Sequence, residues 1–90
     1  MKIGSRVSIV VPNYNGIAFM EACLRALLDD APQAEILVVD NGSTDGSREL
    51  LEEQFPEVAV IALDRNYGFC RAANKGMKAA SAPYVILLNN

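Results

Sequence analysis

Short runs of consecutive apolar residues alternate along the chain with segments in which apolar residues recur every three or four positions. The continuous runs cover residues 7–11, 35–39, 58–63 and 84–88, and they are rich in Val and Ile. An uninterrupted apolar run of this length is typical of a strand that is covered on both faces. The pattern therefore predicts four buried strands.

The three segments between these runs have helical periodicity. Their apolar stripes are Ile17, Met20, Leu24, Leu27 and Leu28 in the first, Leu50, Leu51 and Phe55 in the second, and Phe69, Ala72, Ala73, Gly76, Met77 and Ala80 in the third. Charged residues occupy the opposite faces, which is typical of helices that cover a sheet on one side. The third stripe consists mainly of small residues, so we expect that helix to approach its sheet closely.

The order β-α-β-α-β-α-β predicts an α/β fold, a Rossmann-like parallel sheet with right-handed crossovers and helices on its faces. We expect a single domain over residues 1–90. The sequence stops directly after the fourth predicted strand, which suggests a truncated piece of a longer protein. That strand would then leave a sheet edge uncovered, and we expect it to promote oligomerisation.

Composition supports one compact domain, since 51% of the 90 residues are hydrophobic and the mean hydropathy is +0.15. The apolar runs are far shorter than the roughly 20 residues that a membrane span needs, so we expect a soluble, cytoplasmic protein. The formal net charge of -3 gives no reason to expect nucleic acid as a partner. Residues 65–90 nevertheless contain four basic residues and no acidic one. An anion would prefer that region, and a solvated helix face is the alternative interpretation.

The two cysteines, Cys23 and Cys70, lie within the first and third helical segments, and the chain contains no His. Their separation fits no metal-binding spacing. We expect both to be small core residues in a reducing compartment.

Polar residues are distributed unequally between the two sets of loops. The loops that leave the predicted strands read PNYNG, DNGSTDG, DRNYG and NN, whereas those that enter strands read DDAPQA, PE and SAP. Six of the seven asparagines lie in the first set and none in the second. Turn preference alone would not separate them in this way, and ligands of parallel α/β sheets bind at the carboxyl ends of the strands. We therefore predict a polar binding site at that edge.

Two residues at this edge are candidates for contact with a nucleotide. Tyr14, beside Pro12, offers a ring on which a base could stack, and its alternative is packing over the sheet edge. Asp40 offers an acceptor for the N–H of a base or for a ribose hydroxyl. Its alternative is a turn or cap residue, but Ser43, Thr44 and Asp45 already supply capping groups for the next helix, so Asp40 is not needed in that role. The glycine-rich GxGxxG turn of dinucleotide-binding domains is absent after the first strand.

Further candidates lie in the third helix and at the end of the chain. Arg71 and Asn74 are three residues apart, on one helix face near its N-terminus, where they could meet a phosphate. Asn89 and Asn90 follow the fourth strand and could orient a sugar or support a metal ligand, although hard divalent cations prefer carboxylates.

Three segments, VSIVVPNYNG, ILVVDNGSTDGS and NYGFCRAANKGMKAASAPYVILLNN, together resemble the N-terminal half of a family 2 inverting glycosyltransferase with the GT-A fold. The resemblance implies a nucleotide-sugar donor with Pro12, Asn13 and Tyr14 lining the base. It further implies that Asp40 bonds a uracil or thymine edge and that Asp45 supports its loop. Arg71 and Asn74 would lie near the ribose and phosphates.

In that family the fourth strand leads into a DxD-type motif that binds Mg or Mn at the diphosphate. Asn89 and Asn90 match its first two positions, and the third lies beyond the last residue. Asn in first place is similar to the NxD variant of rhamnosyltransferase-like members, which implies a UDP- or dTDP-linked deoxysugar. The family's general base belongs to the second half of the fold, so no residue here is assigned as catalytic.

Two other classes of function remain open at this point. The chain could be a non-catalytic nucleotide-binding module or a folded fragment that binds nothing. A nicotinamide-binding Rossmann domain is disfavoured by the missing glycines and would be indicated by NAD binding.

Overall fold

The computed structural model describes residues 6–89, which form four strands and three helices in strict alternation. In chain order these are β1 (Val7–Asn13), α1 (Ile17–Asp30), β2 (Glu35–Asp40), α2 (Ser47–Gln54), β3 (Ala59–Ala62), α3 (Phe69–Ala79) and β4 (Tyr84–Leu87). All the strand pairs are parallel and the strand order is β3-β2-β1-β4. The predicted Rossmann-like α/β fold is therefore confirmed. None of the helices within residues 6–89 combines the length and hydropathy that a membrane span requires.

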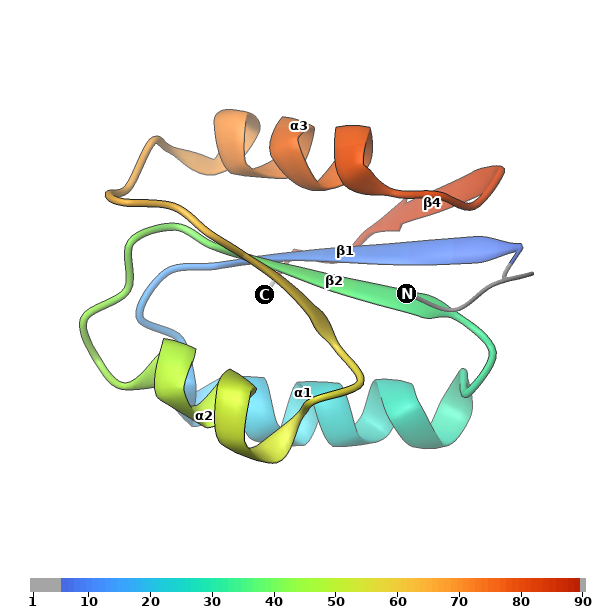
Figure 1. Cartoon of the computed structure of the whole chain (residues 1–90), viewed down its shortest axis with the longest axis horizontal. Helices are drawn as coiled ribbons and strands as arrows, with labels where there is room; N and C mark the ends of the chain where they lie inside the picture. The colour runs from blue at the N-terminus through green and yellow to red at the C-terminus, as the bar shows by residue number, and fades with distance from the viewer. Residues whose placement is uncertain (1–5, 90) are drawn as a thin grey trace.

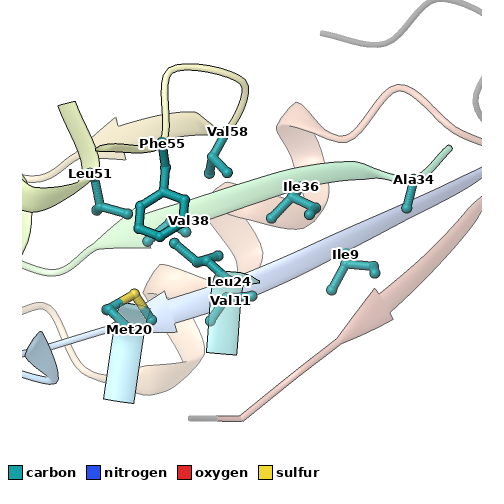
Figure 2. Packing of buried hydrophobic residues seen from close by; sticks show 10 residues of the cluster. All are labelled: Ile9, Val11, Met20, Leu24, Ala34, Ile36, Val38, Leu51, Phe55 and Val58. Carbon is teal, nitrogen blue, oxygen red and sulfur yellow. The ribbon is translucent and has the colours of Figure 1, made fainter. Parts of the chain in front are cut away.

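The sheet lies between two helical layers, with α1 and α2 on one face and α3 on the other (Figure 1). The larger part of the core fills the space beneath α1 and α2 (Figure 2), and it consists of Ile9, Val11, Met20, Leu24, Ala34, Ile36, Val38, Leu51, Phe55 and Val58. The inward residues of β1 and β2 alternate between this layer and the α3 layer, because successive side chains of a strand point to opposite faces. The two central strands are thus buried on both sides.

Helix α3 packs very closely on β1 and β2, as its small residues predict. Ala72, Ala73 and Gly76 are its buried residues. A Cβ atom built on Gly76 would lie 2.3 Å from Val10 Cγ1 and 2.9 Å from Val39 Cγ2. Glycine is therefore required at this position for α3 to lie where it does.

The expectation that every apolar run is a fully buried strand is wrong for the edges of the sheet. All four residues of β4 are exposed, and β3 is only half-buried. A continuous apolar run does not reveal which strands occupy the edges, because the strand order depends on how the crossovers place them. Association through the β4 edge remains a prediction.

The cysteines also differ from expectation. Cys70 is exposed on α3, so its assignment to the core is wrong, whereas Cys23 on α1 is half-buried. Helix α3 buries Ala73 and Gly76 against the sheet, and this orientation turns Cys70 outwards. Burial raises the pKa of the Cys23 thiol. Both cysteines are free.

A buried carboxylate ties the amino ends of the strands together. Glu35, at the start of β2, is 2% exposed. Its Oε1 accepts hydrogen bonds from Ser8 Oγ (2.7 Å), Ser81 N (3.0 Å) and Ser81 Oγ (3.0 Å). Burial raises the pKa of Glu35, but these hydrogen bonds outweigh it, and the net pKa lies below the ordinary value. The carboxylate thereby fastens the α3–β4 connection to the sheet.

Candidate functional site

The carboxyl ends of the strands meet at one edge of the sheet, and a pocket of about 290 Å³ lies there. It is lined by Pro12, Asn13, Tyr14, Asn41, Asn66, Gly68, Phe69 and Asn89. The asparagines come from four segments that are distant in sequence, at the ends of β1, β2 and β4 and in the β3–α3 loop. Part of the polar edge that the loop composition predicts therefore forms one concave site.

Asp40 lies beneath this pocket and does not line it. Its side chain is fully buried. Oδ1 accepts a hydrogen bond from Asn13 Nδ2 at 3.1 Å, and Oδ2 accepts one from the Ser43 amide at 3.1 Å. The interpretation that Asp40 is unnecessary to the turn is wrong, because it bonds the turn's own backbone. The geometry instead lets Asp40 orient Asn13, its neighbour across the β1–β2 pair.

Arg48 completes the set of partners of Asp40. This residue of α2 donates from one terminal nitrogen to Asp40 Oδ2 at 3.2 Å and to the Leu63 carbonyl at 2.8 Å. The guanidinium thus joins the ends of β2 and β3, and it balances a charge that would otherwise be buried alone. Arg48 is not among the site residues predicted from the sequence. The one available signal was a lone base in an otherwise acidic helix, SRELLEEQ.

Asn41 is a second buried polar residue that is not among the site residues predicted from the sequence. It is 4% exposed, and its Oδ1 accepts from the Tyr67 amide at 2.9 Å. Its Nδ2 donates to Asn66 Oδ1 at 2.9 Å and to the Gly68 carbonyl at 3.2 Å. One side chain thereby holds the β3–α3 loop in the shape that forms a wall of the pocket.

The loops after β2 and β3 also touch through their backbones. Gly42 has a φ of +76°, and a Cβ built on it would lie 2.5 Å from the Arg65 Cα. Glycine satisfies both the left-handed conformation and the close approach. The sequence motif DNG therefore has a steric reason at this position.

Asp45 links the starts of two helices. Its Oδ2 accepts from the Ile17 amide of α1 at 3.0 Å, and its Oδ1 accepts from the Ser47 amide of α2 at 3.0 Å. Burial raises the pKa of Asp45, but these hydrogen bonds and the one from the Ser47 hydroxyl lower it by more. The net pKa therefore lies below its usual value. The expected capping role of Ser43 is wrong, because its Oγ accepts from the Asn15 amide of the neighbouring loop instead.

The structure does not bring Arg71 and Asn74 into this pocket. Both are exposed on α3 and line a neighbouring shallow groove of about 220 Å³ together with Lys75 and Lys78. Their predicted adjacency on one helix face is confirmed. Asn90 lies outside the described residues.

The residues described do not by themselves fit a divalent cation site. Within residues 6–89, no three His, Cys, Asp or Glu side chains gather as metal ligands would. The pocket offers amide oxygens, such as that of the exposed Asn89, but no carboxylate lines it. Mg²⁺ is normally held through at least one carboxylate.

The chemistry of the pocket is that of binding. Its amides can donate and accept hydrogen bonds, and the ring of Tyr14 is 52% exposed beside them. Neutral amides and an aromatic ring suit a planar, hydrogen-bonding ligand such as a nucleobase. The lining residues include neither a carboxylate nor a histidine that could act as general base.

Comparison with known proteins agrees with the resemblance. The family model described as glycosyl transferase family 2 matches residues 8–90. The glycosyltransferase TuaG of Bacillus subtilis (strain 168), whose name refers to teichuronic acid biosynthesis, is 35% identical over 88 residues, which cover 93% of this chain and 35% of TuaG. An undecaprenyl-phosphate 4-deoxy-4-formamido-L-arabinose transferase of Proteus mirabilis (strain HI4320) is 33% identical, over 94% of this chain and 28% of that protein.

Solved structures have the same fold. A mannosyltransferase of Pyrobaculum calidifontis in complex with GDP-Man and Mn²⁺ has a TM-score of 0.80 and 26% identity, and the match covers 93% of this chain and 27% of that one. S. aureus TarS residues 1–349 in complex with UDP has a TM-score of 0.82 and 26% identity, with the same coverage of 93% and 27%. The chain spans about a third or less of the length of these relatives.

Proposed function

Since the chain belongs to glycosyl transferase family 2, we propose that it is the donor-binding part of an inverting glycosyltransferase. In this proposal the enzyme works in the cytoplasm and transfers a sugar from a nucleotide diphosphate to a glycan or lipid-linked acceptor. Relatives named for teichuronic acid and for an undecaprenyl-phosphate substrate support a role in polysaccharide assembly. The general base would come from outside these 90 residues.

The observation that carries the proposal is the convergence of Tyr14 and the asparagines from four segments in one pocket at the carboxyl edge. Ligands of open parallel sheets bind at this edge. The pocket lies over a network of buried, mutually bonded polar side chains. Such a network holds the lining side chains in place before a ligand arrives, which reduces the ordering cost of binding.

We assign the residues to two roles. Pro12, Asn13, Tyr14 and Asn89 contact the nucleotide sugar, with the base on Tyr14. Asp40 orients Asn13 by a hydrogen bond and does not contact the ligand itself. Asp45 holds the loops that follow β1 and β2, next to Asn13 and Asp40.

Arg71 and Asn74 are proposed to reach the diphosphate from the adjoining groove. Asn90 is proposed as a further donor-binding residue.

The donor is proposed to be UDP- or dTDP-linked. The similar structures contain UDP or GDP-Man, which supports a donor that carries a nucleoside diphosphate. The two ligands differ in their base, so the preference for a base depends on this chain's own pocket. Asn at position 89 agrees with an NxD-type motif of rhamnosyltransferase-like enzymes, and a deoxysugar donor follows from that likeness. The Mg or Mn that the family implies needs a carboxylate ligand, and none is among the residues that line the described pocket.

A titration followed by amide NMR tests this proposal. UDP and dTDP are each added with and without Mg²⁺, which is diamagnetic and stands in for Mn²⁺. Both nucleotides should shift the amide signals of Tyr14, Asn41 and Phe69. The amides of Gln33 and Ala34, at the opposite edge, should not move. Shifts confined to that opposite edge would contradict the proposed site.

Substitution of the stacking ring gives the matched comparison. Tyr14→Ala should weaken UDP binding about tenfold or more, since base stacking contributes roughly 1–3 kcal/mol. Tyr84→Ala removes an exposed ring from β4, where Tyr84 is 62% exposed against 52% for Tyr14, and should leave the affinity unchanged. No binding of any nucleotide sugar by the unaltered chain would favour the inert-fragment alternative, and preferential binding of NAD would favour a nicotinamide-binding domain.

A further inference from the structure

Helix α3 and the loop before it carry four cations on the side away from the sheet. Arg65, Arg71, Lys75 and Lys78 are all exposed, and we call them the α3 basic face. Arg71, Lys75 and Lys78 follow one another at spacings of four and three residues, so they form a row about 10 Å long on one side of the helix. Arg65 joins the row through Tyr67, over whose ring its guanidinium lies at 4.8 Å.

Arg71, Lys75 and Lys78 form no ion pair within residues 6–89, whereas Arg65 lies over the Tyr67 ring and, after the hydrogen bond from Tyr67, lowers the pKa of the neighbouring Asp64. The ion pairs formed within residues 6–89 are Arg25–Glu21 and Arg48–Asp40, neither of which involves α3. The sequence from 65 to 90 contains no acid. The Asp64 carboxylate lines one hollow with Arg71 and Lys75 but forms no ion pair with them, and it accepts a hydrogen bond from the Tyr67 hydroxyl.

The arrangement also opposes local helix stability. Arg71 lies in the first turn of α3, where the positive end of the helix dipole disfavours a cation. Arg71 and Lys75 form a like-charge pair at i,i+4, and such pairs are unfavourable. Only Lys78, in the last turn, is favoured by the dipole. A row of charges that the fold itself does not use is best explained by a partner outside the chain.

We propose that the α3 basic face docks on an anionic lipid surface. A row of unpaired cations on the convex outer side of a helix can meet many headgroup phosphates at once, and each basic residue close to an anionic bilayer adds to the attraction. The rest of the chain is acidic and would be repelled, so the docking has a defined orientation.

This orientation leaves the candidate pocket open. The pocket lies at the carboxyl edge of the sheet, and α3 covers one face of that sheet (Figure 1). The inference goes beyond the proposed function, since membrane docking requires no nucleotide. Arg71 is shared with the proposed diphosphate site, so the docking test rests on Lys75 and Lys78. If the acceptor is lipid-linked, as proposed above, docking would bring it beside the donor site.

Vesicle co-sedimentation of the 90-residue chain tests the proposal. The chain should bind vesicles of phosphatidylglycerol and phosphatidylcholine, should not bind phosphatidylcholine alone, and should be released by high salt. Lys75→Gln with Lys78→Gln should weaken binding about 25-fold, from about fivefold for each cation near the surface. Adding Arg71→Gln should raise the loss to about a hundredfold.

A control double variant distinguishes an effect of the α3 basic face on vesicle binding from an effect of the net charge. Arg6→Gln with Arg25→Gln changes the net charge equally but lies elsewhere, and it should alter binding less than twofold. Equal losses in the two double variants would overturn the proposal, as would equal binding to uncharged vesicles. Displacement by polyphosphate at the same phosphate concentration would overturn it too, because the face would then bind a soluble polyanion.

Circular dichroism of each variant checks that the fold is intact. Nucleotide binding by the double variants distinguishes failure of the membrane-docking proposal from failure of the proposed donor site.

Discussion

Gly76→Ala should destabilise the protein, although the same change in an exposed helix would stabilise it. The added Cβ would lie 2.3 Å from Val10 Cγ1 and 2.9 Å from Val39 Cγ2, whereas carbon atoms in contact prefer about 3.5–4.0 Å. Both valines are fully buried and have stiff χ1 angles, so neither can move aside easily. Helix α3 must therefore retreat from the sheet.

The expected magnitude follows from two opposing effects. Overpacking of a core costs about 1–3 kcal/mol, and replacing glycine by alanine within a helix returns up to about 1 kcal/mol. Because two close contacts are violated together, we expect a net loss of about 1–2 kcal/mol in the free energy of unfolding. Urea denaturation should then show a midpoint lower by roughly 1–2 M, for a small domain with an m-value near 1 kcal/mol/M.

Two companion variants make this test specific. Asn74→Ala, on the exposed side of α3, should keep or slightly raise the midpoint. Val10→Ala in the Gly76→Ala background should cost less than Val10→Ala alone, because it removes the clashing methyl groups. A Gly76→Ala protein more stable than the parent would refute the close packing of α3 on β1.

Two further predictions concern the buried charges. Arg48→Met leaves the Asp40 carboxylate buried without its cation, so we expect a loss of about 2 kcal/mol in urea denaturation, reduced from the fully buried case because Arg48 is partly exposed. Adding Asp40→Asn should recover part of that loss, and no recovery would argue against the ion pair. The pKa of Glu35 is depressed in the folded state, so its contribution to stability is present above the unfolded pKa and is lost as pH falls through the folded one. Glu35→Gln should therefore flatten the decline in stability below about pH 5, measured as urea midpoints against pH; an unchanged slope would count against the hydrogen-bonded carboxylate.

Much of the candidate site could be anticipated from the sequence, but not which residues line the pocket and which ones hold the lining residues in place. The asparagine-rich loops were predicted to share one edge, and Asn13, Asn66 and Asn89 do line one pocket. The sequence could not indicate that Asp40 would be buried beneath Asn13, or that Arg48 would reach it from the next helix. Both facts depend on strand register and helix position, which bring together residues that the local pattern treats separately.

The order and type of the elements were determined by the sequence itself, because hydrophobic periodicity and turn residues act over a few positions and the right-handed crossover leaves few topologies. The small stripe of α3 likewise predicted close packing, since side-chain size is a local property. Only the tertiary structure decided which strands lie at the edges, which helix face turns Cys70 outwards, and which polar residues hold the pocket rather than line it. These outcomes depend on contacts between residues 25 or more positions apart, such as Asn13 with Asp40 and Asn41 with Asn66. No local pattern specifies such contacts, because their partners meet only when the whole sheet has formed.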